Sequence, residues 1–167
     1  MKVFKEVQRF TQTWLLVLMG FSLIVPLVLT TREFLSENSG FSVGGFLSVI
    51  GILLVSIVPI FFFKLSTRID EDGIHYQFFP FHFKMKKITW QEIEKAYVKT
   101  YDPIGDYGGW GLKGGFLWNK SKGTAINVSG DIGIQLELKK GKKILIGTQK
   151  EQEAKNVLQT YINKDIL

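Results

Sequence analysis

The stretch FSVGGFLSVIGILLVSIVPIFFF, Phe41 to Phe63, holds no charged side chain over 23 residues. A helix needs roughly 20 residues to cross the hydrocarbon core of a bilayer. A second uncharged stretch, WLLVLMGFSLIVPLVLT from Trp14 to Thr30, is at the lower limit of this length unless residues 10–13 extend it. Both stretches are apolar on every side, whereas a surface helix of a globular protein has one polar face. We therefore predict a hairpin of two transmembrane helices, at about residues 10–30 and 42–63.

Two other interpretations fit apolar runs of this kind. They are typical also of buried helices in a soluble protein, although such helices usually have a polar stripe. Lys2, Lys5 and Arg9 before an apolar run are typical of a cleaved signal peptide. Against that interpretation, Glu6 lies in the charged region, the apolar run is longer than usual, and no small-residue cleavage site follows Thr30.

The residues that flank the first helix predict how it begins and how it packs. Phe4, Val7, Phe10 and Trp14 recur every three or four residues, which predicts an amphipathic helix along the membrane interface. Small residues in the second helix favour close packing on the first. These are Gly44, Gly45, Ser48, Gly51 and Ser56.

The flanking charges predict the orientation of the hairpin. Basic residues precede the first helix, Arg32 alone is basic between the helices, and Lys64 and Arg68 follow the second. Cytoplasmic flanks are usually the more basic ones. We expect a multi-pass inner-membrane protein with both termini in the cytoplasm. The absence of cysteine rules out a disulfide framework but does not choose a compartment.

Beyond Phe63 the pattern changes to the alternation typical of strands, so residues 1–63 are predicted to form the anchor and residues 64–167 a second domain. Turn residues, such as Asp72-Gly73, separate the predicted strands. A final helix, 149–163, is predicted from a capping box of Thr148 and Glu151 before an apolar face. The strands are expected at 65–70, 73–80, 81–89, 93–101, 115–118, 124–128, 132–139 and 142–147. In the strand 93–101, alternation places Ile93, Lys95, Tyr97 and Lys99 on one face and Ala96, Val98 and Thr100 on the other.

This order of antiparallel strands and one closing helix is that of the pleckstrin-homology-like (PH-like) fold. The segments YGGWG (107–111) and INVSGDIGIQLELKKGKKILIGTQ (126–149) resemble bacterial membrane-anchored PH-like proteins, and FKEVQRFTQTW (4–14) is similar to the start of uncharacterised two-span members. The resemblance covers most of the chain. It implies an α+β membrane protein: a two-helix transmembrane hairpin followed by a PH-like antiparallel β-barrel with a C-terminal capping helix.

The glycine-rich segment YDPIGDYGGWGLKGG, 101–115, is the first candidate site. Its spacing does not match a phosphate-binding P-loop, and predicted strands lie on both sides, which excludes a dinucleotide fingerprint. The glycines therefore favour a tight, bulged backbone whose gaps are covered by aromatic side chains. The alternative is a groove for a ligand or partner, contacted by Tyr107, Trp110 and Lys113.

Lysines are the second candidate. The predicted domain from Lys64 onward has 17 Lys and Arg against 12 Asp and Glu. Lysines at strand ends commonly do no more than increase solubility, but beside a membrane they can contact anionic lipid headgroups. The two clusters are Lys84, Lys86 and Lys87, and Lys139, Lys140, Lys142 and Lys143. Asp70, Glu71 and Asp72 stand where lipid-binding PH domains place basic residues, which argues against inositide recognition.

Catalysis has little support in the sequence. His75 and His82 have no accompanying ligand set or nucleophile motif. The acidic turn 70–72 is predicted to be a group of solvated carboxylates. We therefore predict no enzyme, no metal and no cofactor. Nucleic-acid binding would need stacking aromatics on a basic face, and none is expected. We predict a non-catalytic binding or scaffolding module whose partners are the bilayer, its anionic headgroups, and a membrane protein or second copy. The alternative function is a small oligomeric transport or channel subunit.

Overall fold

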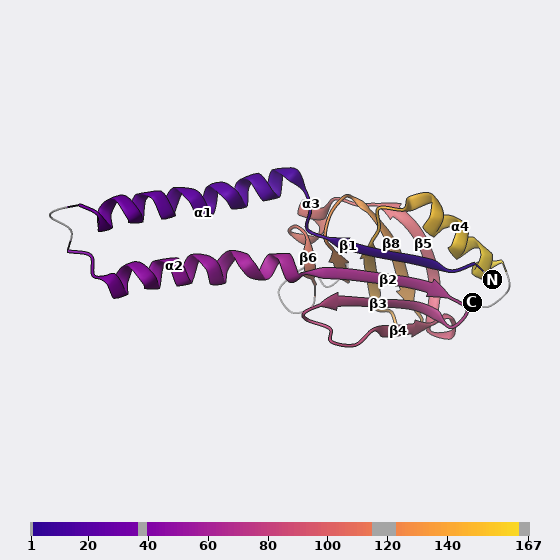
Figure 1. The fold of residues 1–167 in the computed structure, drawn as a ribbon. Coiled ribbons are helices and arrows are strands. Elements are labelled where there is room, and N and C mark those ends of the chain that lie inside the picture. The colour runs from indigo at the N-terminus through magenta and orange to yellow at the C-terminus, as the bar shows by residue number, and fades with distance from the viewer. Residues whose placement is uncertain (1, 37–39, 115–122, 164–167) are drawn as a thin grey trace. The chain divides into compact units, whose positions relative to one another are not determined.

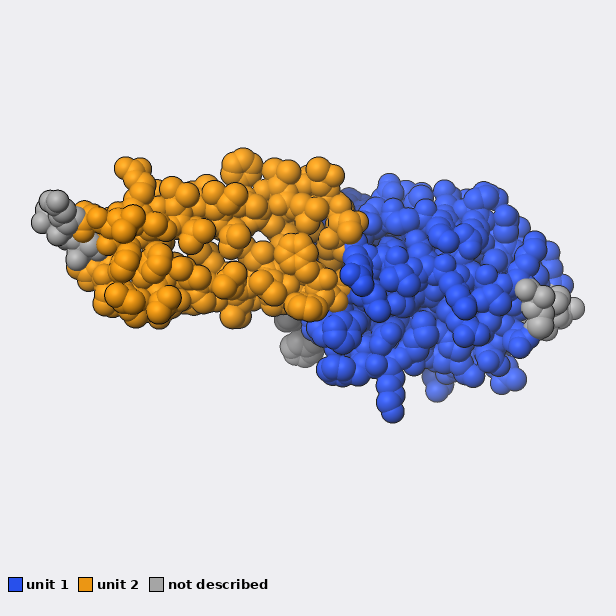
Figure 2. All heavy atoms as spheres, in the orientation of Figure 1, with its two compact units in different colours: residues 1–9, 64–167 blue, residues 10–63 orange. Residues whose placement is uncertain are grey.

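The computed structural model describes residues 2–36, 40–114 and 123–163. The chain divides into two compact units, shown in Figure 2. Unit 1 comprises residues 1–9 and 64–167, and unit 2 comprises residues 10–63. Residues 1–9, which the sequence pattern groups with the anchor, therefore belong to the same unit as the strands.

Unit 2 is a pair of helices. Helix α1 covers Thr13–Phe34, helix α2 covers Val43–Ile57, and the 3-10 helix η1 continues α2 over Val58–Phe62. Ser42 caps α2, since its side-chain oxygen accepts a hydrogen bond of 3.1 Å from the amide of Gly45. The rings of Phe34 and Phe46 stack at 4.6 Å and join the two helices. The two long helices are thus present, with α1 beginning and ending later than predicted.

The predicted close packing through small residues is wrong. A Cβ added at Gly51 would meet no atom within 4 Å, and at Gly44 and Gly45 the nearest atom belongs to Ser42 of the same helix start. Met19 is the buried residue of α1, and α2 has none. The hydroxyls of Ser48 and Ser56 instead donate to carbonyl oxygens of their own helix. The small residues therefore do not mark a contact between α1 and α2.

Unit 1 begins with a four-stranded antiparallel sheet, called sheet A (Figure 1). Its strands lie in the order β1 (Phe4–Arg9), β2 (Lys64–Asp70), β3 (Gly73–Phe79) and β4 (Lys86–Thr89). The amphipathic helix predicted over 4–14 is wrong in its first part, because residues 4–9 form strand β1. Arg9 pairs with Lys64 and Phe4 with Ile69, so β1 pairs with all of β2 except Asp70.

Strand β1 forms because its alternate side chains find partners inside unit 1. Phe4 is fully buried, and Glu6 and Gln8 are nearly so. The Glu6 carboxylate accepts hydrogen bonds from the Thr148 hydroxyl at 2.6 Å and from the Gln149 amide at 2.8 Å. Gln8 Nε2 donates to the carbonyl oxygen of Gly147 at 2.7 Å. Buried polar groups need such partners, and a helix over 4–9 could not direct all three side chains to one side.

A five-stranded sheet, sheet B, completes the strands that the structure describes. Its order is β5-β8-β9-β7-β6, with β7 and β9 parallel, so the prediction of antiparallel strands alone is wrong. In the described part of the chain the strands form two separate sheets rather than a closed barrel. The predicted strand 115–118 lies outside the described residues. The strands are β5 (Ile93–Thr100), β6 (Gly111–Lys113), β7 (Thr124–Asn127), β8 (Ile132–Leu138) and β9 (Lys143–Gly147).

Strand β5 differs from its predicted faces at its start. The pairing of Ile93 with Leu138 and of Lys95 with Glu137 shows a bulge between Ile93 and Lys95. A bulge inserts one residue and changes which face the following side chains occupy. Ile93 is therefore fully buried, whereas the even alternation had placed it beside the exposed Lys95. Just before β5, the 3-10 helix η2 (Trp90–Glu92) begins with a capping box of Thr89 and Glu92 that the prediction missed.

The core of unit 1 lies on the inner faces of the sheets and under helix α4 (Glu151–Ile162). Trp90 stacks on Tyr161 at 5.2 Å, and its indole nitrogen donates to the carbonyl oxygen of Asp70 at 2.9 Å. The capping box predicted at Thr148 and Glu151 is wrong: α4 has Lys150 as its N-cap with no side-chain cap. Thr148 instead donates to Glu6, so this hydroxyl joins sheet B to β1.

Candidate functional site

The two helices of unit 2 leave most of their apolar side chains uncovered. The 18-residue windows of Thr13–Phe34 and Val43–Phe62 have mean hydropathies of 2.2 and 2.6, and only 6% and 0% of each window is buried. Phe21 and Val55 are 66% and 73% exposed. By length and composition, both helices can cross a membrane.

Four hydroxyl groups of the two helices donate hydrogen bonds within their own helix. Ser22 donates to Met19 O at 2.9 Å, and Thr31 donates to Leu27 O at 2.7 Å. Ser48 and Ser56 make the same kind of bond in α2. A polar group that serves transport at membrane depth has to bind its cargo. These hydroxyls are already used by the backbone.

The glycine-rich segment forms a short helix, α3 (Pro103–Tyr107), followed by β6. The Asp102 carboxylate accepts from the Ile104 amide at 3.0 Å and caps this helix. Gly108 ends it in the left-handed conformation, with φ of 71°, and its amide donates to Ile104 O. Only glycine adopts that conformation at low cost. The glycines thus shape the backbone after α3, but the helix itself differs from the tight, bulged backbone that was predicted for the segment.

Of the three residues predicted for a groove, Tyr107 is 3% exposed and packs edge-on against Tyr101 at 5.8 Å. The Trp110 indole donates to Gly130 O at 3.0 Å, and Lys113 lies on β6. Tyr107, Tyr101, Ala125 and Leu145 form one buried cluster. Tyr107 and Trp110 thus mainly hold the segment against sheet B.

Beneath this segment lies a buried polar pair. Asn127 Nδ2 donates to the Tyr101 hydroxyl at 2.6 Å, and Asn127 Oδ1 accepts from the Gly111 amide at 2.9 Å. Burial raises the pKa of Tyr101 to about 12, although the hydrogen bond from Asn127 opposes the rise. The phenol therefore stays protonated at neutral pH and serves as a structural group.

A shallow groove lies on the outer face of sheet B, beside α3, with a cavity volume of about 220 Å³. Tyr97 donates a 3.0 Å hydrogen bond to Glu137 at its edge. Burial, with this bond and the charge of Glu137, raises the pKa of Tyr97. The lining includes two lysines and two carboxylates, which suits a polar segment that carries both charges. Its lining comprises Tyr97, Lys99, Asp106, Tyr107, Gln135, Glu137 and Lys143.

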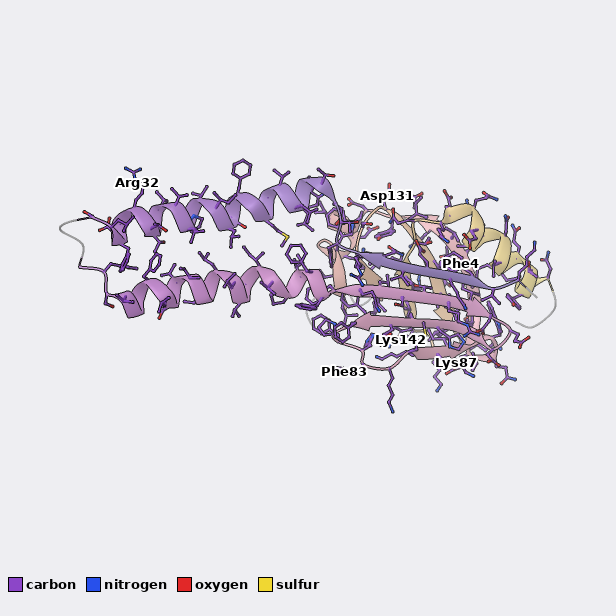
Figure 3. All side chains as sticks on the ribbon, in the orientation of Figure 1. Phe4, Arg32, Phe83, Lys87, Asp131 and Lys142 are labelled. Atoms are coloured by element: carbon purple, nitrogen blue, oxygen red, sulfur yellow. The ribbon has the colours of Figure 1, made fainter. Side chains whose placement is uncertain are left out.

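The seven candidate headgroup lysines are divided between two elements. Lys84, Lys86 and Lys87 lie on β4 and the loop before it, and Lys139, Lys140, Lys142 and Lys143 lie at the turn between β8 and β9. The amide of Lys139 donates to Glu92 O at 3.0 Å, which places that turn beside the start of β5. Figure 3 labels one lysine of each cluster, Lys87 and Lys142, in the lower half of unit 1.

Of the acidic turn that the sequence predicted as solvated carboxylates, Glu71 and Asp72 are exposed, but Asp70 is only 4% exposed. Asp70 Oδ1 lies 3.1 Å from His75 Nε2, and Asp70 Oδ2 forms an ion pair of 2.6 Å with Arg68 Nε. The pKa of Asp70 is lowered: burial raises it, but the hydrogen bonds from His75 and Asp72 and the charges of His75 and Arg68 outweigh burial. Asp70, Asp72 and His75 come close enough to hold a cation, but these contacts already use the Asp70 carboxylate.

His82, the other histidine, also has a structural contact. Its Nδ1 accepts a 3.3 Å hydrogen bond from the Phe78 amide, and its ring packs edge-on against Tyr76. Burial, with the nearby charge of Lys86, lowers the pKa of His82. In the described part of the chain, each histidine is thus occupied by a neighbour in sheet A.

No protein-family model matches this chain. A search of curated proteins also found no significant match. The resemblance to PH-like proteins therefore stands on the quoted segments alone. The structure agrees with its coarser part, in that two apolar helices accompany a sheet-rich unit with a C-terminal helix.

The sequence analysis missed two features of these sites. The groove on sheet B joins residues from β5, α3, β8 and β9, whose pairing depends on the strand order. The buried Glu6 could have been suspected, because Phe4, Glu6 and Gln8 also alternate as in a strand. The helical spacing of Phe4, Val7 and Phe10 was the stronger signal and led to the wrong choice.

Proposed function

We propose that this chain is a two-span protein of the inner membrane, in which α1 and α2 anchor a PH-like sheet unit that acts as a non-catalytic binding or scaffolding module. The observation that carries the proposal is the uncovered apolar surface of both helices, with 6% and 0% of their apolar windows buried. Contact of so much apolar surface with water is unfavourable by roughly 25 cal/mol per Å². Lipid removes that cost.

The charges at the ends of the helices support a cytoplasmic location for unit 1. Arg9 and Lys64 pair across β1 and β2, where the chain passes to and from the helices. At the other end of α1, Arg32 is followed directly by Glu33. The larger basic excess is thus on the side of unit 1, which the positive-inside tendency assigns to the cytoplasm.

The side chains of unit 1 support binding rather than catalysis. His75 and His82 make structural contacts, and the Tyr101 hydroxyl is held by Asn127. The groove on the outer face of sheet B offers Lys99 and Lys143 beside Asp106 and Glu137. We assign this face to a polar segment of a membrane-protein partner. The anchor is favoured over a transport subunit because four helix hydroxyls, those of Ser22, Thr31, Ser48 and Ser56, donate to the backbone of their own helices.

Extraction and protease protection test the anchor and its orientation together. Membranes that contain the full chain are washed with alkaline carbonate, and intact cells and inside-out vesicles are treated with protease. We expect the chain to stay in the membrane pellet, and unit 1 to be cleaved in inside-out vesicles but not in intact cells.

Release by carbonate would contradict the two-span anchor. Cleavage of unit 1 from outside the cell would contradict its cytoplasmic location while leaving the anchor intact. A detergent-treated sample is the control that shows the protease sites to be accessible.

A further inference from the structure

The loop between β3 and β4 exposes three apolar side chains within five residues. Phe81, Phe83 and Met85 are 59%, 81% and 44% exposed. Figure 3 labels Phe83 at the lower edge of unit 1. Large apolar side chains gathered at one place on a surface usually mark a contact with a partner or a membrane.

The structure of this loop holds those side chains outward. The His82 amide donates to Phe78 O at 2.8 Å, and Gln77 Nε2 donates to His82 O and Phe83 O at 3.1 and 3.0 Å. The ring of Phe83 also packs edge-on against Phe79 at 6.2 Å. The loop is therefore ordered before it meets a partner, which lowers the entropic cost of binding.

The strand register places this loop beside both chain connections to the helices. Arg9 pairs with Lys64, and Lys64 pairs with Phe79, at one end of sheet A. Neighbouring strands are about 4.8 Å apart, so Phe79 is one strand from the connection to η1 and about 10 Å from the connection to α1. The residues that join the helices of a membrane anchor lie at headgroup depth, and the loop leaves the sheet next to them.

The charges of the loop complement an anionic surface. Lys84, Lys86 and Lys87 follow Phe83, and no acidic residue occurs from Phe79 to Thr89. Aromatic side chains are enriched at the boundary between lipid and water, and lysines near anionic headgroups contribute roughly 1 kcal/mol each. Aromatic residues next to lysines favour a lipid surface over the apolar face of another protein.

We propose that Phe81, Phe83 and Met85 insert into the interface of the bilayer that α1 and α2 span, while Lys84 and Lys86 contact anionic headgroups. This inference rests on the proposed membrane anchor and adds a second point of contact to it. With two connections and one inserted loop, unit 1 is held in one orientation on the membrane. Of the two predicted lysine clusters, only the cluster on β4 and the loop before it contacts lipid headgroups in this proposal.

The absence of cysteine allows a direct test by single-site labelling of the full chain. Phe83→Cys, Glu71→Cys and Val55→Cys are each labelled with the fluorophore NBD and reconstituted into phosphatidylcholine vesicles with and without phosphatidylglycerol. Glu71 is the matched control, since its turn is at the other end of the β2–β3 hairpin. Val55 on α2 reports insertion of the anchor.

We expect lipids with a shallow spin label to quench NBD at position 83 at least threefold more than at position 71. Quenching at position 55 with equal, weak quenching at 83 and 71 would overturn the loop insertion and leave the anchor standing. No quenching at position 55 would overturn both. A blue-shifted but unquenched label at position 83 would indicate a protein contact and would also overturn the insertion.

A pair of triple variants tests the lysines. The first triple variant should lower quenching at position 83 in anionic vesicles to the value in neutral vesicles; it combines Lys84→Gln, Lys86→Gln and Lys87→Gln. The second triple variant removes the same charge from the other cluster and should leave the quenching at position 83 unchanged; it combines Lys139→Gln, Lys140→Gln and Lys142→Gln. Equal effects of both triples would overturn the assignment of headgroup contact to the β4 cluster.

Discussion

Val55 on α2 and Leu136 on β8 are both aliphatic, yet Val55 is 73% exposed and Leu136 is fully buried. Most apolar side chains of α1 and α2 show the first pattern, and those of strands β8 and β9 in unit 1 show the second. A chain can be rich in apolar residues for two different reasons. In unit 1 they are buried by the packing of the sheets, whereas in unit 2 most of them are left uncovered, which is the observation behind the proposed anchor.

The largest effect should come from truncating equivalent leucines in the two units. Leu136→Ala leaves a cavity in a closed core and should lower the free energy of unfolding of unit 1 by about 2–5 kcal/mol. Leu54→Ala, at a position 48% exposed on α2, should change the free energy of unfolding of unit 2 by less than about 0.5 kcal/mol. Urea titration of the full chain in nanodiscs, followed by near-UV circular dichroism, measures both. Equal destabilisation by the two variants would show that unit 2 has a packed core of its own.

A second contrast concerns glycine. Gly73 has φ of 142°, and an added Cβ would overlap the carbonyl oxygen of Ile88 on β4. Gly73→Ala should therefore destabilise unit 1 by about 1–3 kcal/mol. Gly51→Ala should be neutral or should stabilise α2 slightly, because nothing lies within 4 Å and alanine favours helix.

The rates of amide hydrogen exchange in β2–β4 and in α2 measure the effects of Gly73→Ala and Gly51→Ala separately. Faster exchange in α2 of Gly51→Ala would reveal a close helix contact at that glycine, such as one with a second copy of the chain. Unchanged exchange in β2–β4 of Gly73→Ala would contradict the tight β3–β4 approach.

The smallest expected effect depends on pH and belongs to unit 1. The folded-state pKa of Asp70 is lowered because hydrogen bonds and charges from His75, Asp72 and Arg68 outweigh burial. The Asp70 charge therefore stabilises the folded state above the unfolded pKa of about 4, and this stabilisation is lost as pH falls through the folded pKa. Asp70→Asn should be less stable than wild type by about 1–2 kcal/mol at pH 7, and the difference should shrink below about pH 4.

Unfolding at several pH values measures that difference, with the exposed neighbour change Glu71→Gln as the control. The helix content of unit 2 should not follow the same pH dependence. A constant difference between wild type and Asp70→Asn down to pH 2 would contradict the role of the Asp70 charge.

How much could be predicted from the sequence differed between the two units. The helices were predictable because length and absence of charge are properties of a single segment. The strand and helix types of unit 1 were mostly predictable from alternation, but Ile93 was assigned to the wrong face because a bulge depends on the partner strand. Of the residues that line the groove, only Tyr107 and Lys143 had been predicted as site residues. The other lining residues come together only after β5 pairs with β8.

The sequence by itself determined two apolar helices, a strand-rich second half and the shaping role of Gly108. Each follows from local composition, from length, or from the conformations open to one residue. Only the tertiary structure decided that residues 4–9 form an outer strand of sheet A. Phe4, Val7 and Phe10 fit a helix and Phe4, Glu6 and Gln8 fit a strand, so the local pattern allowed both. The hydrogen-bond partners of Glu6 and Gln8 lie 139 to 143 residues further along the chain, and their positions favour the strand.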